Sequence, residues 1–228
     1  MKILAIIPAR GGSKGIPLKN IQIINGKPLL YYSVKAAHNS KEVDRTIVST
    51  DHPHIEKIAK KNGAEVIKRP KIIATDKARI ELVMFHVVNS LKKDENYIPD
   101  IIILLQNTSP LRTSNDIDNA IKIFKKNKYD SLLSVSPSHY FLWKKIKKSA
   151  KPVNYDPLNR PNRQEIKDEF VENGAIYISK YSNFIKSKCR ISGKIGLYVM
   201  KPEVSIEIDS RIDFEIVEKI MKQKNSRY

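Results

Sequence analysis

Short apolar runs alternate with helix-patterned segments along most of the chain, and this alternation restricts the fold more than any other feature. Runs rich in β-branched residues predict buried strands, whereas apolar residues at every third or fourth position predict helices with one buried face. The predicted strands are 3–7, 43–50, 64–67, 101–106, 131–135, 175–178 and 195–200, and the predicted helices are 28–38, 53–62, 76–92, 114–126 and 212–222. This order predicts an α/β fold with a mostly parallel sheet covered on both faces, whose strands present ligand-binding residues at their carboxyl ends.

Residues 137–170 break the alternation, because they show little periodicity and many Pro, Asn, Lys and Arg residues. Only about 60 residues follow this stretch, so we interpret it as an arm of one domain spanning residues 1–228 rather than as a linker. The arm contains the apolar group Tyr140, Phe141, Leu142 and Trp143. Such a group needs a surface that buries it, and we expect a second copy of the chain, in a homodimer, to provide one.

The composition excludes several classes of protein. With 41% hydrophobic residues among 228, the chain can bury a sizeable core and is not disordered. The single Cys189 excludes an intramolecular disulfide and a cysteine-based zinc site. The apolar run 3–7 is too short for a signal peptide or a membrane span, so we expect a cytoplasmic protein that does not bind membranes.

The net charge of +18 makes a nucleic-acid-binding module the obvious alternative to an enzyme. However, the lysines are spread along the chain and gather on predicted helix faces, as in residues 122–128. No recognised signature interleaves aromatic with basic residues. We therefore interpret the charge as a solvated basic surface and expect no nucleic-acid partner.

A glycine-rich basic turn follows the first predicted strand. Gly11, Gly12 and Gly15 allow backbone N–H groups to approach an anion. The same turn carries cationic and hydrogen-bonding side chains that suit a triphosphate, namely Arg10, Ser13, Lys14, Lys19 and Asn20. The segment lacks the spacing of a P-loop, and a plain basic turn is the alternative.

Two acids, Glu207 and Asp209, stand one residue apart before the last predicted helix. In an extended strand their side chains point to the same side and could hold a Mg²⁺ ion that bridges phosphate oxygens. The alternative is a polar strand end followed by a helix cap.

Four segments closely resemble the CMP-N-acylneuraminate cytidylyltransferases over nearly the whole chain. They are R-x-x-S-K-G-x-P-x-K-N at 10–20, L-L-Q-N-T-S-P-L-R at 104–112, N-G-A-I-Y-I at 173–178 and S-I-E-I-D at 205–209. The resemblance implies a three-layer α/β/α nucleotidyltransferase (Rossmann-like) fold with an extended dimerisation arm. The implied reaction joins CTP to an acidic nine-carbon 2-keto sugar, giving a CMP-sugar and pyrophosphate.

The resemblance also implies roles for individual residues. Arg10 and Lys14 would neutralise phosphate charge, and Asp209, with Glu207 less firmly, would bind Mg²⁺ or Mn²⁺. The nucleotide would contact Arg10, Ser13, Lys14, Lys19 and Asn20, with support from Arg69. The acidic sugar would contact Gln106, Thr108, Ser109, Arg163 and Asn173, where Arg163 could clamp its carboxylate.

Three positions depart from the family pattern. Asn107 replaces the usual proline, Glu207 replaces an aspartate, and Val171 stands where some bacterial members carry arginine. Asn107 should change the stiffness of its loop without loss of chemistry, whereas Val171 leaves the identity of the sugar open. A cytidylyltransferase for an eight-carbon acidic sugar, or for another sugar class, is therefore the near alternative.

Overall fold

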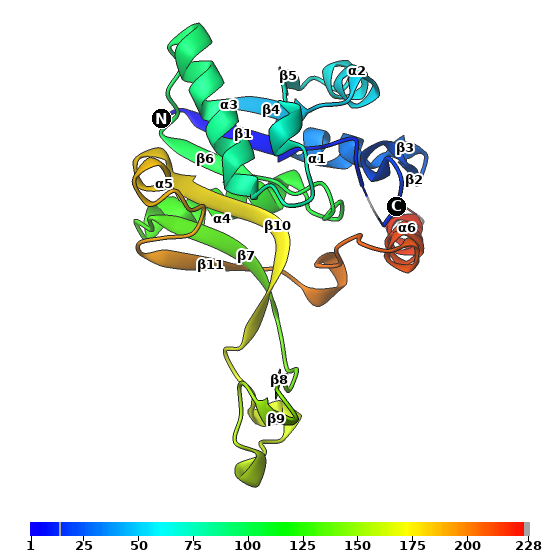
Figure 1. Ribbon diagram of the computed structural model, residues 1–228, viewed down its shortest axis with the longest axis vertical. Coiled ribbons are helices and arrows are strands. Elements are labelled where there is room, and N and C mark those ends of the chain that lie inside the picture. Colours follow the sequence, from blue (N-terminus) through cyan, green and yellow to red (C-terminus); the bar gives the residue numbers. More distant parts are fainter. Residues whose placement is uncertain (14, 226–228) are drawn as a thin grey trace.

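The computed structural model describes residues 1–13 and 15–225, and a seven-stranded sheet forms its centre (Figure 1). The strand order is β11-β7-β10-β6-β1-β4-β5. The strands are β1 (Ile3–Pro8), β4 (Arg45–Thr50), β5 (Glu65–Lys68), β6 (Ile101–Leu104), β7 (Ser131–Pro137), β10 (Phe170–Lys180) and β11 (Ile195–Val199). All neighbouring pairs are parallel except those of β10, which runs antiparallel to β6 and β7.

Helices cover both faces of this sheet, which confirms the predicted three-layer α/β/α fold. They are α1 (Leu29–His38), α2 (Pro53–Lys61), α3 (Ile80–Glu95), α4 (Ser114–Lys126), α5 (Tyr181–Ser187) and α6 (Arg211–Asn225). Strand β1 shows why its apolar run has no polar positions. Ala5 and Ile7 pack in one cluster with α1, α2 and α4, while Leu4 and Ile6 pack in the other with α3 and α5. Because both faces of the strand are buried, every residue of the run must be apolar.

A third apolar cluster lies beside the sheet and seats α6. Phe214 and Val217 of α6 pack there with Ile208, which precedes the helix, and with Ile24 and Leu29. Ile24 belongs to a small hairpin of β2 (Ile23–Ile24) and β3 (Lys27–Pro28) that the sequence pattern did not predict. The packing fixes the acidic segment before α6 against the turn that follows β1.

At the carboxyl edge of the sheet, two predicted elements differ most from the observed ones. The helix expected from residue 76 begins at Ile80, because residues 69–79 form a loop with the short 3₁₀ helix Lys71–Ile73. Strand β10 begins at Phe170 instead of 175, and its register shifts between Glu172 and Tyr177. Gly174 lies in this shift with a φ of +63°, a conformation that glycine adopts without strain.

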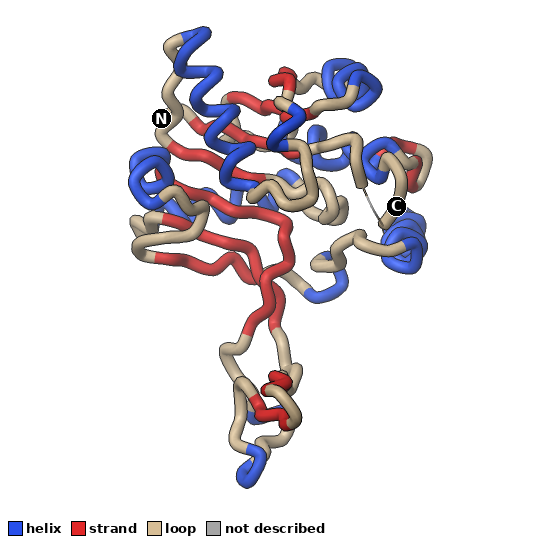
Figure 2. The backbone as a smooth tube through the Cα atoms, viewed as in Figure 1, coloured by secondary structure: helices blue, strands red, loops and turns tan. Residues whose placement is uncertain are grey.

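The arm is the chain between β7 and β10, and it projects away from the sheet (Figures 1 and 2). It holds a two-stranded sheet of β8 (Trp143–Ile146) and β9 (Ser149–Pro152), followed by 3₁₀ turns at Pro157–Asn159 and Arg163–Glu165. Most of its large apolar residues are exposed, with Trp143 at 55% and Leu158 at 96% of their full surface.

None of the helices in the described part of the chain combines the length and apolar character that a bilayer crossing requires.

Candidate active site

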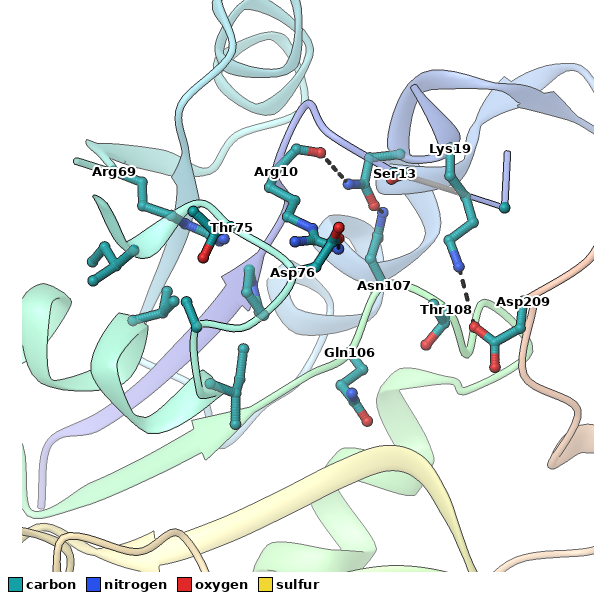
Figure 3. A pocket seen from close by; sticks show the side chains of 17 residues that line it. Arg10, Ser13, Lys19, Arg69, Thr75, Asp76, Gln106, Asn107, Thr108 and Asp209 are labelled. Atoms are coloured by element: carbon teal, nitrogen blue, oxygen red, sulfur yellow. Dashed lines mark hydrogen bonds and ion pairs between the residues drawn. The ribbon is translucent and has the colours of Figure 1, made fainter. Parts of the chain in front are cut away.

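A cavity of about 410 Å³ opens at the carboxyl ends of β1, β5 and β6 (Figure 3). Such edges of parallel sheets are the usual place for ligands, as the sequence analysis expected. Its lining comes from the end of β1 and the turn after it, the loop before α3 and the start of that helix, the loop after β6 and the segment before α6. The lining residues are Pro8, Arg10, Ser13, Gly15, Lys19, Asn20, Arg69, Ile73, Thr75, Asp76, Ala78, Ile80, Val83, Gln106, Asn107, Thr108 and Asp209.

The turn after β1 is held from three directions. The N–H of Gly11 donates to Asp51 Oδ1 at 2.9 Å, and Asn20 Nδ2 donates to the carbonyl of Arg10 at 2.8 Å. At Gly15, an added Cβ would lie 2.6 Å from the carbonyl oxygen of Asp209. Only glycine allows this close approach, so the glycine-rich turn brings the N-terminal and C-terminal parts of the site together. Lys14 lies outside the described residues.

Two cations of the site already face carboxylates. The Arg10 guanidinium forms an ion pair with Asp76 of the loop before α3. Lys19 Nζ donates to the carbonyl of Ile208 at 2.5 Å and lies 3.3 Å from Asp209 Oδ1. The Lys19 side chain is 14% exposed and that of Asp209 75% exposed, so the carboxylate extends into the open part of the cavity.

Arg69 forms one end of the cavity and is almost fully buried. Its Nη2 donates to the carbonyl of Ser49 at 2.7 Å and its Nε to Ser49 Oγ at 3.2 Å. Burial, partly offset by Asp51, lowers the pKa of Arg69 to about 10. The side chain therefore remains a cation at neutral pH, and its orientation is fixed before any ligand enters.

The predicted sugar-binding residues of the sheet divide into two groups. Gln106 and Thr108 line the cavity, whereas Ser109 and Asn173 are buried beneath it. Ser109 Oγ donates to the carbonyl of Asn173 at 3.1 Å, and Asn173 Oδ1 accepts from Ser134 Oγ at 2.6 Å. Ser109 and Asn173 thus join the loop after β6 to β10 and β7.

Glu207 lies next to the cavity, close to Gln106 and to the turn at Gly174. A Cβ added to Gly174 would lie 1.7 Å from Glu207 Oε1 and 2.5 Å from Gln106 Oε1, so glycine is needed here as well. Burial and the neighbouring Asp209 raise the pKa of the Glu207 carboxyl. The raised pKa means that the desolvated carboxylate is disfavoured until a positive charge approaches it, and carboxylate oxygens are ligands that a hard divalent cation prefers. The described residues form no cluster of three or more His, Cys, Asp or Glu ligands. Glu207 and Asp209 are the two acids at this edge of the cavity whose oxygens could ligate a divalent cation.

Arg163 is the predicted site residue that lies farthest along the chain from the others. It sits exposed in the 3₁₀ turn Arg163–Glu165 of the arm, and the arm extends away from its own cavity (Figure 1). The cavity of one chain therefore contains no arginine from the arm.

The structure adds lining residues to those predicted. Thr75 and Asp76 have a sequence that suits a helix cap, and only the loop 69–79 brings them to the cavity, where Asp76 pairs with Arg10. Asn107 donates from Nδ2 to Asn20 Oδ1 at 2.8 Å, a contact between residues far apart in sequence. The apolar lining residues Ile73, Ala78, Ile80 and Val83 carry no motif that could have identified them.

The parallel-sheet edge, the cationic glycine-rich turn and the acids facing it are the features of a nucleotidyltransferase. The chain belongs to the cytidylyltransferase family, whose family model matches residues 4–228. It is 38% identical over 222 residues to N-acylneuraminate cytidylyltransferase of Oncorhynchus mykiss, covering 95% of this chain and 49% of the fish protein. It is 36% identical over 234 residues to the Escherichia coli O18:K1:H7 protein of the same name, covering 98% and 53%. The chain thus spans about half the length of these curated relatives.

A further relative matches over nearly its whole length. Post-translational flagellin modification protein B of Campylobacter coli is 36% identical over 231 residues, covering 98% of this chain and 97% of that protein. Among solved structures, CMP:2-keto-3-deoxy-manno-octonic acid synthetase complexed with CTP superposes with a TM-score of 0.72 at 18% identity, covering 98% and 100% of the two chains. The 4-diphosphocytidyl-2C-methyl-D-erythritol synthase of Anaerococcus prevotii gives 0.68 at 15% identity, covering 97% and 96%. Both structures are similar in fold.

Proposed function

We propose that this protein transfers the cytidylyl group of CTP to an acidic nine-carbon 2-keto sugar of the N-acylneuraminate type. The observation that carries the proposal is the convergence of Arg10, Lys19 and Asp209 on one cavity with Gln106 and Thr108. The cations suit the phosphates, the acid suits a divalent ion, and the polar pair lies where a second substrate can meet the α-phosphate. The names of the relatives supply the identity of the sugar class.

In the proposed reaction the anomeric hydroxyl of the sugar attacks the α-phosphorus. A bond forms between the α-phosphorus and the sugar oxygen, and the hydroxyl proton passes to water. The bond between the α-phosphorus and the oxygen that bridges to the β-phosphorus breaks, and pyrophosphate leaves. Arg10 and Lys19, together with Lys14, would neutralise the phosphate oxygens where charge spreads in the transition state. Ser13, Asn20 and Arg69 would place the nucleotide.

Asp209 and Glu207 would hold Mg²⁺ or Mn²⁺, which when bound adds positive charge at the reacting phosphates. Lys19 contacts Asp209 and therefore fixes this carboxylate beside the phosphate site. The proposal is supported by the chemistry of the two acids: both offer oxygen ligands, Asp209 lines the cavity, and the charge of Asp209 acts on Glu207.

The sugar side of the proposal requires a homodimer. Gln106 and Thr108 line the cavity, with Ser109 and Asn173 supporting their loop from beneath, but Arg163 does not reach it. In the family that the sequence resembles, the arm reaches the other subunit. The partner subunit's Arg163 could then meet the sugar carboxylate. A cytoplasmic location without nucleic-acid or membrane partners stays a prediction from the sequence.

A pyrophosphate-release assay tests the function directly. We expect release only with CTP among the four ribonucleotides, only with an acidic 2-keto sugar, and only with a divalent ion present. Asp209→Asn should remove most turnover, whereas Asp94→Asn, an exposed acid of α3, should not. Use of eight-carbon but not nine-carbon acids would select the alternative substrate. Absence of release with every pair, together with tight RNA or DNA binding at physiological salt, would contradict the enzyme function itself.

A further inference from the structure

Asn107 carries a polar atom that the ligand-free site leaves unused. The residue lines the cavity yet is only 3% exposed, and its Oδ1 has no hydrogen-bond partner among the described residues. A buried acceptor without a partner loses its contact with water and gains nothing in return. Such an atom in the wall of a binding cavity is a candidate contact for the ligand.

The hydrogen-bond network fixes which end of the amide is free. The carbonyl of Arg10 can only accept, so the group of Asn20 facing it must be Nδ2. Asn20 then presents Oδ1 to Asn107, which must donate from its own Nδ2. The remaining atom of Asn107 is therefore an acceptor, and its partner must be an O–H or N–H group.

Its position within the cavity indicates which part of a nucleotide would supply that donor. Figure 3 shows Asn107 between two ends, with Arg69 and Thr75 on one side and Lys19 and Asp209 on the other. The cation and acid at the second end suit the phosphates. A nucleoside triphosphate lying along this cavity, with its base toward Arg69, brings its ribose to the middle.

We propose that Asn107 Oδ1 accepts a hydrogen bond from the 2′- or the 3′-hydroxyl of the CTP ribose, so that Asn107 selects nucleotides that carry this hydroxyl. This inference rests on the proposed cytidylyl transfer and adds a specificity residue to it. Family members with the usual proline at this position have no side-chain acceptor there. The selectivity that depends on Asn107 is therefore a property of this chain.

The test compares CTP with analogues in which the 2′- or the 3′-hydroxyl is replaced by hydrogen or by fluorine. Fluorine resembles a hydroxyl in size but cannot donate. We expect the unmodified enzyme to lose about 10-fold or more in kcat/KM with both replacements at one of the two positions. In Asn107→Leu, kcat/KM for CTP should fall to the value for these analogues, so that the ratio of the two kcat/KM values approaches one. Asn115→Leu, which removes an exposed amide of α4, should keep the ratio of the unmodified enzyme.

Each outcome decides the proposal. Equal use of CTP and all analogues by the unmodified enzyme would overturn it while leaving CTP-dependent transfer intact. A ratio that persists in Asn107→Leu would also overturn it, because another group would then read the hydroxyl. A change confined to the KM of the acidic sugar would assign Asn107 to that substrate instead and overturn the proposal. If Asn107→Leu fails to fold, Asn107→Pro replaces it, and the fluorinated analogues on the unmodified enzyme need no variant.

Discussion

The sheet body and the arm bury their apolar residues to opposite degrees. Leu104 of β6 and Ile176 of β10 are fully buried, whereas Tyr140, Trp143 and Leu158 of the arm expose more than half of their surface. Burial of apolar surface is the main driving force of folding, so the body is stabilised by its own packing. The arm lacks this source, and its exposed side chains gain burial only against another molecule.

The arm nevertheless holds a defined shape. Phe141 and Tyr155 meet edge to face with ring centroids 4.6 Å apart, and the Arg160 guanidinium lies 4.2 Å from the Phe141 ring centroid. Asn154 Nδ2 donates to the carbonyl of Tyr140 at 2.9 Å and to Glu169 Oε2 at 2.7 Å, and thereby joins the two ends of the arm. An arm that is ordered before association loses less conformational entropy when a partner binds. The contrast with the body supports the proposal that the arm contacts a second subunit.

Core packing should give the largest difference between the two regions. Leu104→Ala should lower the free energy of unfolding by about 2–5 kcal/mol, because it leaves a cavity in a tightly packed layer. Trp143→Ala, at an exposed arm position, should leave that free energy unchanged in the separated chain but weaken dimer association. Urea unfolding and analytical ultracentrifugation measure the two effects. A stable, fully active monomer at micromolar concentration would contradict the role given to the arm.

The phosphate site should respond almost as strongly. Lys19→Ala should reduce kcat/KM for CTP by about 10²-fold, or about 3 kcal/mol, because Lys19 is a fixed cation of the cavity. The matched control is Lys122→Ala, an exposed lysine of α4. Pyrophosphate release is the measurement. Equal rates in the two variants would remove Lys19 from the phosphate site.

A smaller effect should come from the arm itself. Arg163→Ala should raise KM for the acidic sugar by about 10-fold, with KM for CTP unchanged, since it removes a charge-assisted hydrogen bond to a carboxylate. Mixing Arg163→Ala with Lys19→Ala chains sharpens the test. If the arm serves the partner's cavity, one site of each mixed dimer receives both intact residues and activity returns. A mixture no more active than its components would confine Arg163 to another role.

The smallest effect should be a pH dependence confined to the body. The folded state raises the pKa of Glu207, so it retains a proton that the unfolded chain loses first as pH rises from the usual glutamate value. The free energy of unfolding should therefore fall as pH rises through that window in the absence of a divalent ion. Glu207→Gln should flatten this part of the curve, measured by urea unfolding between about pH 4 and 7. Identical curves for both proteins would show that Glu207 does not titrate in this window.

The sequence predicted the layers of the body because its strands and helices obey simple periodicities. Helix α4 has the predicted bounds, since Thr113 and Asp116 form a capping box that the chain itself encodes. Periodicity says nothing of strand direction, so the antiparallel placement of β10 required the structure. Periodicity also failed to predict α5, because a helix of seven residues is too short to show a recognisable helical pattern.

The sequence likewise predicted individual residues of the candidate site but not the contacts between them. Arg10, Lys19 and Asp209 carry their chemistry within recognisable motifs, and all three line the cavity. The contacts that organise them, such as Arg10 with Asp76 and Asn107 with Asn20, join residues distant in sequence. Those contacts depend on loop paths between strands, which side-chain patterns do not encode.

The two ends of the arm lie side by side, because Phe170 at the start of β10 pairs with Pro137 at the end of β7. An insertion with adjacent ends can change in length and sequence while the strands that carry it stay in register. A descendant of this chain could therefore acquire a new partner, or lose one, by exchanging this segment alone. In protein engineering, the same geometry would allow a tight turn or a foreign module to replace the arm without redesign of the sheet, although Arg163 and the proposed subunit contact would be lost with it.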